Sequence, residues 1–151
     1  MTNNSLRAAF LSPILMPVRI DSMGFTPVSK NQEQNAGPPI DKLEGRVLKM
    51  TALRNRYQRN VVTCSSPDGN RSTNGVLCAD CLHPDCRLKL KVHLRDALLL
   101  YVLYLNVPSA NNLLDLDDEA KYQGEDLCRW RLRLTTRIHG SWTEVIFTRI
   151  P

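Results

Sequence analysis

The chain has 151 residues, of which 42% are hydrophobic, enough for one domain and a tail. Lysine and arginine number 20 against 15 aspartates and glutamates, a formal net charge of +5 that is compatible with an anionic partner. No apolar run approaches the roughly 18 residues of a membrane span. The short apolar stretch 8–16 is interrupted by Pro13 and lacks a cleavage site, so we expect a cytoplasmic protein with no membrane partner.

Residues 1–41 are predicted to form a disordered or adaptable arm, and residues 42–151 a β domain. The arm is rich in Asn, Ser, Gln, Pro and Gly, and its apolar area is too small to offset its ordering entropy. Its apolar residues, Phe10, Leu11 and 14–16, could dock on the domain or on a protein partner.

The first part of the domain mixes apolar and basic residues. A strand is expected over 47–51, followed by a basic loop over 54–59 that contains Arg56 and Tyr57. Residues 65–70 form a strong turn signal because Pro67 fixes φ and Gly69 permits positive φ.

Strict alternation over 87–95 predicts a strand with leucines and Val92 on one face and basic side chains on the other. The nearly continuous apolar run 97–107 is typical of a buried strand. Ser109 could cap a helix to about Tyr122, with Leu113, Leu114 and Ala120 inward and an acidic outer face.

The last two strands are predicted over 128–138 and 142–150, with a turn at 139–141 between them. Trp130, Leu132, Leu134 and Ile138 share one face of the first strand; Trp130 and Trp142 are interpreted as core residues. The pattern indicates a mostly β fold with one short helix, a small curled antiparallel sheet or OB-like barrel with a zinc-loop insertion.

Four cysteines form a candidate metal site with the spacing C-x13-C-x2-C-x4-C: Cys64, Cys78, Cys81 and Cys86. Zinc prefers four tetrahedral ligands, and thiolates clustered in a cytosolic protein are more often metal ligands than disulfides. The sequence therefore favours a structural Zn2+. His83 could replace one thiolate, and unconnected or redox-active thiols are the other interpretation. Cys128 stands apart as a core thiol.

We expect no enzyme activity. A four-cysteine site leaves no open position for water, and no phosphate loop, nucleophile elbow or H-E-x-x-H motif is present. The acidic residues Asp115, Asp117, Asp118 and Glu119 could hold Mg2+ as in a nuclease, but a solvated helix face is the simpler interpretation.

Basic residues recur at alternate positions in two segments, 87–95 and 129–137, and neither segment has an acid at those positions. A charged outer face that keeps the domain soluble would usually mix signs, whereas a row of cations can follow a phosphate backbone. We therefore predict a nucleic-acid site, with Tyr57 stacking on a base and Tyr101 or Tyr104 as further platforms. Its cations are Arg56, Lys89, Lys91, Arg95, Arg129, Arg131, Arg133 and Arg137.

The cysteine segments 64–69, 75–81 and Cys86, with 104–108, 135–138 and 145–147, form a pattern that resembles small zinc-bearing proteins of bacteriophages and mobile elements. The resemblance covers about residues 60–150. It implies an OB-type single-stranded DNA-binding protein, a curled five-stranded barrel with the zinc loop as an insertion.

Together these patterns favour a non-catalytic, zinc-stabilised protein that binds nucleic acid, above all single-stranded DNA. The alternative is a protein-interaction or regulatory module of a larger assembly that uses the apolar residues of 1–41 as a hook.

Overall fold

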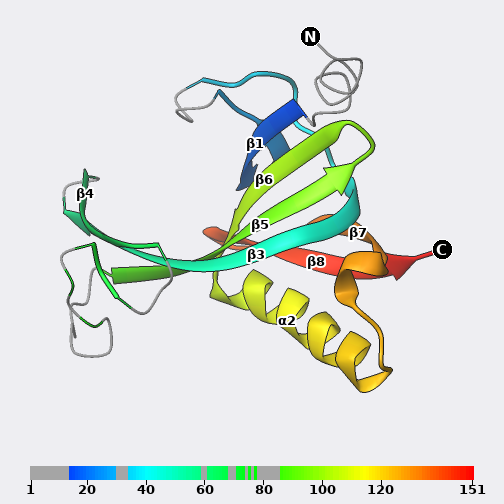
Figure 1. Ribbon diagram of the computed structural model, residues 1–151. Helices are drawn as coiled ribbons and strands as arrows, with labels where there is room; N and C mark the ends of the chain where they lie inside the picture. The colour runs from blue at the N-terminus through cyan, green and yellow to red at the C-terminus, as the bar shows by residue number, and fades with distance from the viewer. Residues whose placement is uncertain are drawn as a thin grey trace, which may run out of the picture.

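The computed structural model describes residues 14–29, 34–58, 61–67, 71–73, 75, 77 and 86–151. The described chain is mostly β with one α-helix, and its sheet is a strongly curled, OB-like half-barrel, as expected (Figure 1). The elements are β1 Ile14–Asp21, β2 Gly24–Pro27, β3 Leu43–Gln58, β4 Val61–Ser66, β5 Cys86–Asp96, β6 Leu99–Leu105, α2 Val107–Tyr122, the 3-10 turn η2 Leu127–Arg129, β7 Arg131–His139 and β8 Trp142–Ile150.

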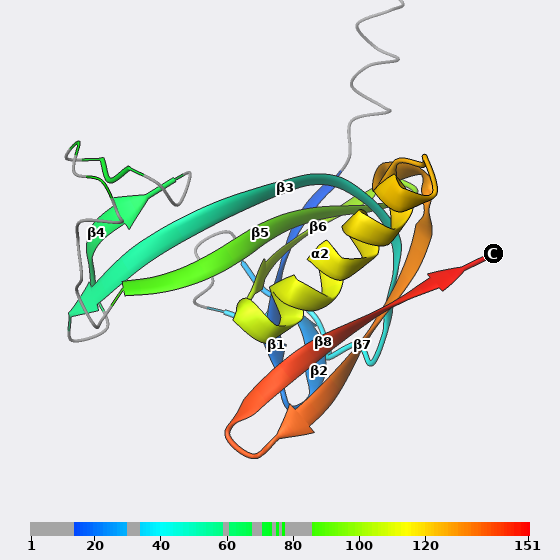
Figure 2. The ribbon, with the colours of Figure 1, turned by 90° about the horizontal axis from the view of Figure 1, so that it is seen from below.

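The strands follow the order β2-β1-β6-β5-β3-β7-β8, and β4 pairs with the end of β3. Neighbours are antiparallel except β1 and β6, which run parallel. The far halves of β3 and β5 project together from the body and carry β4 beside them (Figures 1 and 2).

The sheet curls at β3, which changes partner along its length. Leu43–Gly45 pair with β7, and the strand from Arg46 onward pairs with β5. A Cβ at Gly45 would lie 2.4 Å from the carbonyl oxygen of Arg95, so only glycine lets the strands cross this closely. A register shift between Val47 and Lys49 adds the local twist of a β-bulge.

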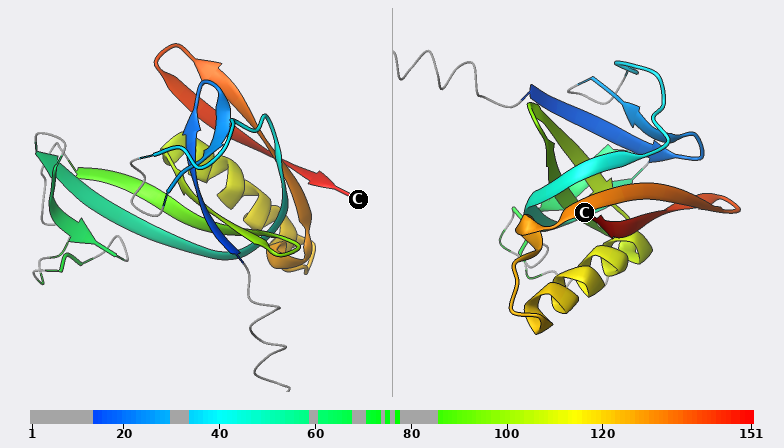
Figure 3. Two further views of the ribbon diagram at one scale, coloured as in Figure 1. Left: turned by 90° about the horizontal axis from the view of Figure 1, so that it is seen from above. Right: turned by 90° about the vertical axis from the view of Figure 1, so that its right-hand side faces the viewer.

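The core fills the inside of the curl. It joins Val92 and Leu94 of β5 and Leu103 of β6 to Leu134 of β7 and Val145 of β8, all fully buried. Apolar burial of this kind is the main favourable term in folding. Helix α2 adds Leu113 and Ala120 to the core and packs against β8, β5 and β6. In Figure 3 (right), β7 and β8 lie between the β1–β2 hairpin and α2.

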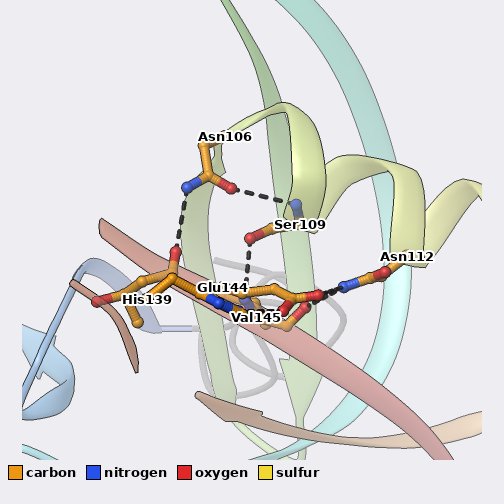
Figure 4. A network of polar contacts seen from close by, with 7 residues as sticks. Asn106, Ser109, Asn112, His139, Glu144 and Val145 are labelled. Carbon is orange, nitrogen blue, oxygen red and sulfur yellow. Dashed lines mark hydrogen bonds and ion pairs between the residues drawn. The ribbon is translucent and has the colours of Figure 1, made fainter. Parts of the chain in front are cut away.

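Polar side chains at the start of α2 form hydrogen bonds with backbone groups at the outer edge of β8 (Figure 4). Ser109 Oγ accepts a hydrogen bond from the Val145 N–H at 2.8 Å, and Asn112 Nδ2 donates to the Val145 carbonyl at 2.9 Å. Asn106, the N-cap, donates to the Thr143 carbonyl and accepts from the Ser109 N–H. The helix thus covers part of a strand edge that would otherwise be open to pairing.

Part of the segment expected as an adaptable arm belongs to this sheet. Val18 of β1 and Phe25 of β2 are buried in the core, and Met16 packs against it. Docking of the segment's apolar residues on the domain was one of two options, and of Ile14 to Met16 only Met16 packs against the core. The side chains of Ile14 and Leu15 are exposed, although their backbones pair with β6. Phe10 and Leu11 lie outside the described residues.

Several local predictions differ from the structure. Residues 54–58 continue β3 and are not a loop, because β4 and β5 supply hydrogen-bonding partners on both sides. The helix is capped by Asn106, not Ser109. Leu114 and Ile138, expected on inner faces, are exposed. None of the described helices has the length and apolar character needed to cross a membrane.

Candidate nucleic-acid interface

The alternation predicted for 87–95 is present in β5. Val92 and Leu94 point into the core, and Lys91, His93 and Arg95 lie on the opposite, outer face of the sheet. Arg95 is exposed, whereas Lys89 and Lys91 are half-buried along their length. Their aliphatic stems therefore lie on the sheet while their ammonium groups can reach solvent.

Strand β3 extends this basic surface. Arg46 is directly opposite Arg95, and Lys49 is opposite His93, so both lie on the same outer face. Within the part of the chain that the structure describes, Lys49, Lys89 and Lys91 form no ion pair with a carboxylate. We call Arg46, Lys49, Lys89, Lys91 and Arg95 the β3–β5 basic face.

The arginines of β7 are on the same side of the sheet but are partly neutralised. Glu44 of β3 is directly opposite Arg133. Its carboxylate accepts hydrogen bonds from Arg133 at 3.0 Å and from Arg131 at 3.2 Å. The acid belongs to a neighbouring strand, so the alternating pattern of β7 by itself does not predict this ion pair.

The other two arginines of that predicted row have separate surroundings. Arg137 is opposite Glu144 of β8, whose negative charge faces it. Arg129 is exposed but belongs to η2, not to β7, because the strand begins two residues later. The β7 row is therefore less cationic than β5 and β3.

The cations of the β3–β5 basic face affect the pKa of His93. Its pKa is lowered from 6.5, first by burial and then by the positive charges of Lys91 and Lys49. Its Nδ1 atom is buried and has no hydrogen-bond partner among the described residues. The imidazole therefore lies beside two cations, and no described carboxylate is among the causes of its pKa shift.

Arg46 and Arg149 are two further arginines near the start of β7 that the sequence pattern did not predict as site residues. Arg149 is opposite the buried Leu132 and so lies on the other face of the sheet. Arg46, Arg95 and Arg131 line a surface cavity of about 590 Å3 where β3 and β7 begin. Close by, the Arg149 guanidinium lies 4.0 Å from the ring centre of Trp130 and 3.4 Å from Glu125. Arg46 lies outside the alternating segments, so only strand pairing could reveal its position.

The tyrosines predicted to stack on bases differ in their exposure. Tyr101 is buried in the core and cannot stack on a ligand. Tyr104 is half-buried on the outer face, with the Lys91 ammonium 5.9 Å from its ring centre. The side chains of Arg56 and Tyr57 lie outside the described residues, although their backbones belong to β3.

The two tryptophans differ. Trp130 is 2% exposed, as expected of a core residue, and its indole N–H donates to Glu125. Trp142 was also expected in the core but is 40% exposed at the start of β8. Val145 and Phe147 of β8 are buried, and because side chains alternate along a strand, Trp142 lies on the opposite, outer face.

The cysteine site lies largely outside the described residues. Cys78 and Cys81 are not described, nor is the side chain of Cys86. Cys64 is half-buried in β4, and the strand register places both it and Cys86 opposite Arg56, one on each side of β3. Cys128, expected as a core thiol, is exposed.

The acidic cluster on α2 has a structural partner. Asp117 forms an ion pair with Lys121 one helical turn later, at 2.9 Å.

No protein-family model matches this chain, and no characterised protein and no solved structure matches it either.

Proposed function

We propose that this protein is a non-catalytic, zinc-stabilised nucleic-acid-binding protein whose ligand is single-stranded DNA. The observation that carries the proposal is the β3–β5 basic face. Five cations from two paired strands share one side of the sheet, and its three lysines have no described carboxylate as partner. Such a row can neutralise successive phosphates of one strand.

The arrangement favours a flexible single strand over a duplex. The sheet is strongly curled, and Tyr104 stands beside Lys91 on the outer face. Aromatic rings next to a cationic row suit unstacked bases, because bases stack on the rings while phosphates contact the cations. A duplex keeps its bases stacked on each other and offers only its backbone to such a face.

Zinc has a structural role in this proposal. Cys64, Cys78, Cys81 and Cys86 would hold the ion at the projecting end of β3 and β5, where β4 joins them. A closed thiolate site would stabilise the chain segment beside the basic face and supply no reactive water.

The test is a fluorescence-anisotropy titration of a labelled oligothymidine and of a duplex of equal length, each at several salt concentrations. We expect tighter binding to the single strand. The logarithm of the affinity should fall with the logarithm of the salt concentration by about 0.7 for each phosphate neutralised.

Matched charge variants locate the contact. The double variant Lys89→Gln and Lys91→Gln should weaken binding and reduce the salt slope by about 1.4, if each lysine contacts one phosphate. Lys121→Gln, which removes a cation from α2, should leave both quantities unchanged. If the wild-type protein binds no oligonucleotide at low salt, the proposal is wrong, and the alternative of a protein-interaction module replaces it.

A further inference from the structure

A cavity of about 440 Å3 opens where the curled sheet fails to close, between the end of β1 and the β7–β8 hairpin. Its volume falls within the range of about 300–1,000 Å3 that is typical of small-ligand sites. Its lining includes Trp142, Tyr104, Ile138, Lys89, Asn106 and Asp21. Two of these side chains, Trp142 and Ile138, were expected in the core and are instead exposed.

Trp142 is held in place from one side. The His139 ring stacks on it with ring centres 4.4 Å apart and planes 15° from parallel. The Nε2 atom of His139 lies 2.7 Å from a Glu144 carboxylate oxygen. The imidazole covers part of the indole. Trp142 is still 40% exposed, and this exposed surface is available to a ligand.

Helix α2 supports this stack. Asn112 Nδ2 donates to the other Glu144 oxygen at 2.9 Å, so hydrogen bonds link the helix through Glu144 to His139 (Figure 4). The stack of His139 on Trp142 extends this chain of contacts to the indole. These two hydrogen bonds are also the main causes that lower the pKa of Glu144. An exposed indole that is already oriented loses little freedom when a flat ligand stacks on it.

The cavity is continuous with the β3–β5 basic face. Lys89 belongs to both, and Tyr104 carries the neighbouring Lys91 over its ring. Asp21 at the end of β1, which also lines the cavity, accepts a hydrogen bond from Arg19 at 3.2 Å. A phosphate would therefore be attracted to the Lys89 side, and the uncharged part of a nucleotide would occupy the space between Tyr104 and Trp142.

We propose that this cavity binds one unpaired base of the single strand, stacked on the exposed side of Trp142, while the adjoining phosphate contacts Lys89. The inference rests on the proposed function and adds a site for the base to a face that otherwise contacts phosphates. It also accounts for a tryptophan and a tyrosine on one surface cavity, next to lysines without described ion pairs.

Tryptophan fluorescence tests the proposal directly. Trp142 should be quenched when oligothymidine binds, because a stacked base contacts the indole. An abasic oligonucleotide with the same number of phosphates should bind the basic face without this quenching. In the Trp142→Leu variant, the remaining Trp130 is buried, so its emission should not respond to DNA.

The affinity should change in parallel. Trp142→Leu should lose about five- to 150-fold in affinity for oligothymidine, the range that one base–aromatic stack contributes, and should retain its affinity for the abasic strand. Tyr122→Leu is the matched control, since Tyr122 is 95% exposed at the end of α2 and away from the cavity. Tyr104→Leu tests the other wall and replaces Trp142→Leu if that variant does not fold.

The outcomes separate the two proposals. Salt-dependent binding with no quenching of Trp142, and unchanged affinity in Trp142→Leu or Tyr104→Leu, would overturn the base site and leave the proposed function standing. Failure of the wild-type protein to bind any oligonucleotide would overturn both.

Discussion

The backbone N–H of Val145 donates to the Ser109 hydroxyl oxygen at 2.8 Å, so a helix side chain completes the hydrogen bonding of an edge strand. Ser109 is 1% exposed and Val145 is fully buried, which excludes water as a substitute partner. Asn112 accounts for the carbonyl of the same residue. Among the described elements, α2 and not another strand thus covers this part of the β8 edge.

Replacing Ser109 with alanine should therefore destabilise the fold. The Val145 N–H would be buried without a partner, at a cost of about 1–3 kcal/mol. Asn112→Ala should cost a similar amount, because it exposes the same edge and releases Glu144. Urea denaturation measures both. Asn111→Ala is the control, since Asn111 is exposed on the same helix and should change the free energy of unfolding by less than about 0.5 kcal/mol.

Glu44 should limit nucleic-acid binding. Glu44→Gln removes the negative charge that holds Arg131 and Arg133, and both guanidiniums become available to phosphates. We expect about fivefold tighter binding, the ~1 kcal/mol that a unit charge contributes at close range in water, and a steeper salt slope. Stability should change little because the ion pairs are partly exposed.

Asp117→Asn is the matched control for this variant, and anisotropy titrations compare the two. It alters the net charge equally and also breaks an ion pair, but on α2. Equal gains in affinity from both variants would mean that only the overall charge matters and that Arg131 and Arg133 do not contact the ligand.

The alternation in β5 was predictable because a period of two residues identifies both faces of a strand without knowledge of its neighbours. The same reasoning failed for β7, since Glu44 is 89 residues away from Arg133 in the chain. Trp142, expected in the core from its place at a strand start, alternates with the buried Val145 and Phe147 and therefore lies on the outer face of β8. Strand pairing with β6 likewise places β1 in the sheet despite its polar, proline-containing surroundings.

Protonation of His93 should lower the stability of the fold but strengthen DNA binding. Its pKa in the folded protein lies below the ordinary value of 6.5, so the unfolded chain binds more protons just below pH 6.5. Stability should therefore fall as the pH is lowered through that window, down to the folded pKa. Bound phosphates offset the charges of Lys49 and Lys91, favour protonation of His93 and should tighten DNA binding as the pH falls.

His93→Gln isolates these effects from those of other titrating groups. Chemical denaturation and anisotropy titrations at pH values between about 5.5 and 7.5 bracket the ordinary histidine pKa. In the variant, both pH dependences should become shallower than in the wild-type protein. An unchanged pH dependence of binding would place His93 away from the phosphates.

Zinc should be required for the stability of the domain. The spacing of Cys64, Cys78, Cys81 and Cys86 predicts one bound Zn2+ per chain, and the thiolates bind it only when deprotonated. Metal analysis of protein purified without chelator should find the ion. Incubation with a strong chelator should remove it and lower the melting temperature, because the free energy of metal binding contributes to folding.

Cysteine variants test which thiols hold the metal. Cys78→Ser should lower both the zinc content and the melting temperature, whereas Cys128→Ser should alter neither, because Cys128 is an exposed thiol outside the cluster. Cys64 and Cys86 approach β3 from opposite sides at Arg56, so losing the metal should also loosen the pairing there. Amide exchange at the end of β3 should then accelerate more than exchange in β7. Full zinc content in Cys78→Ser, with unchanged stability, would show that the cluster does not hold the metal through that thiolate.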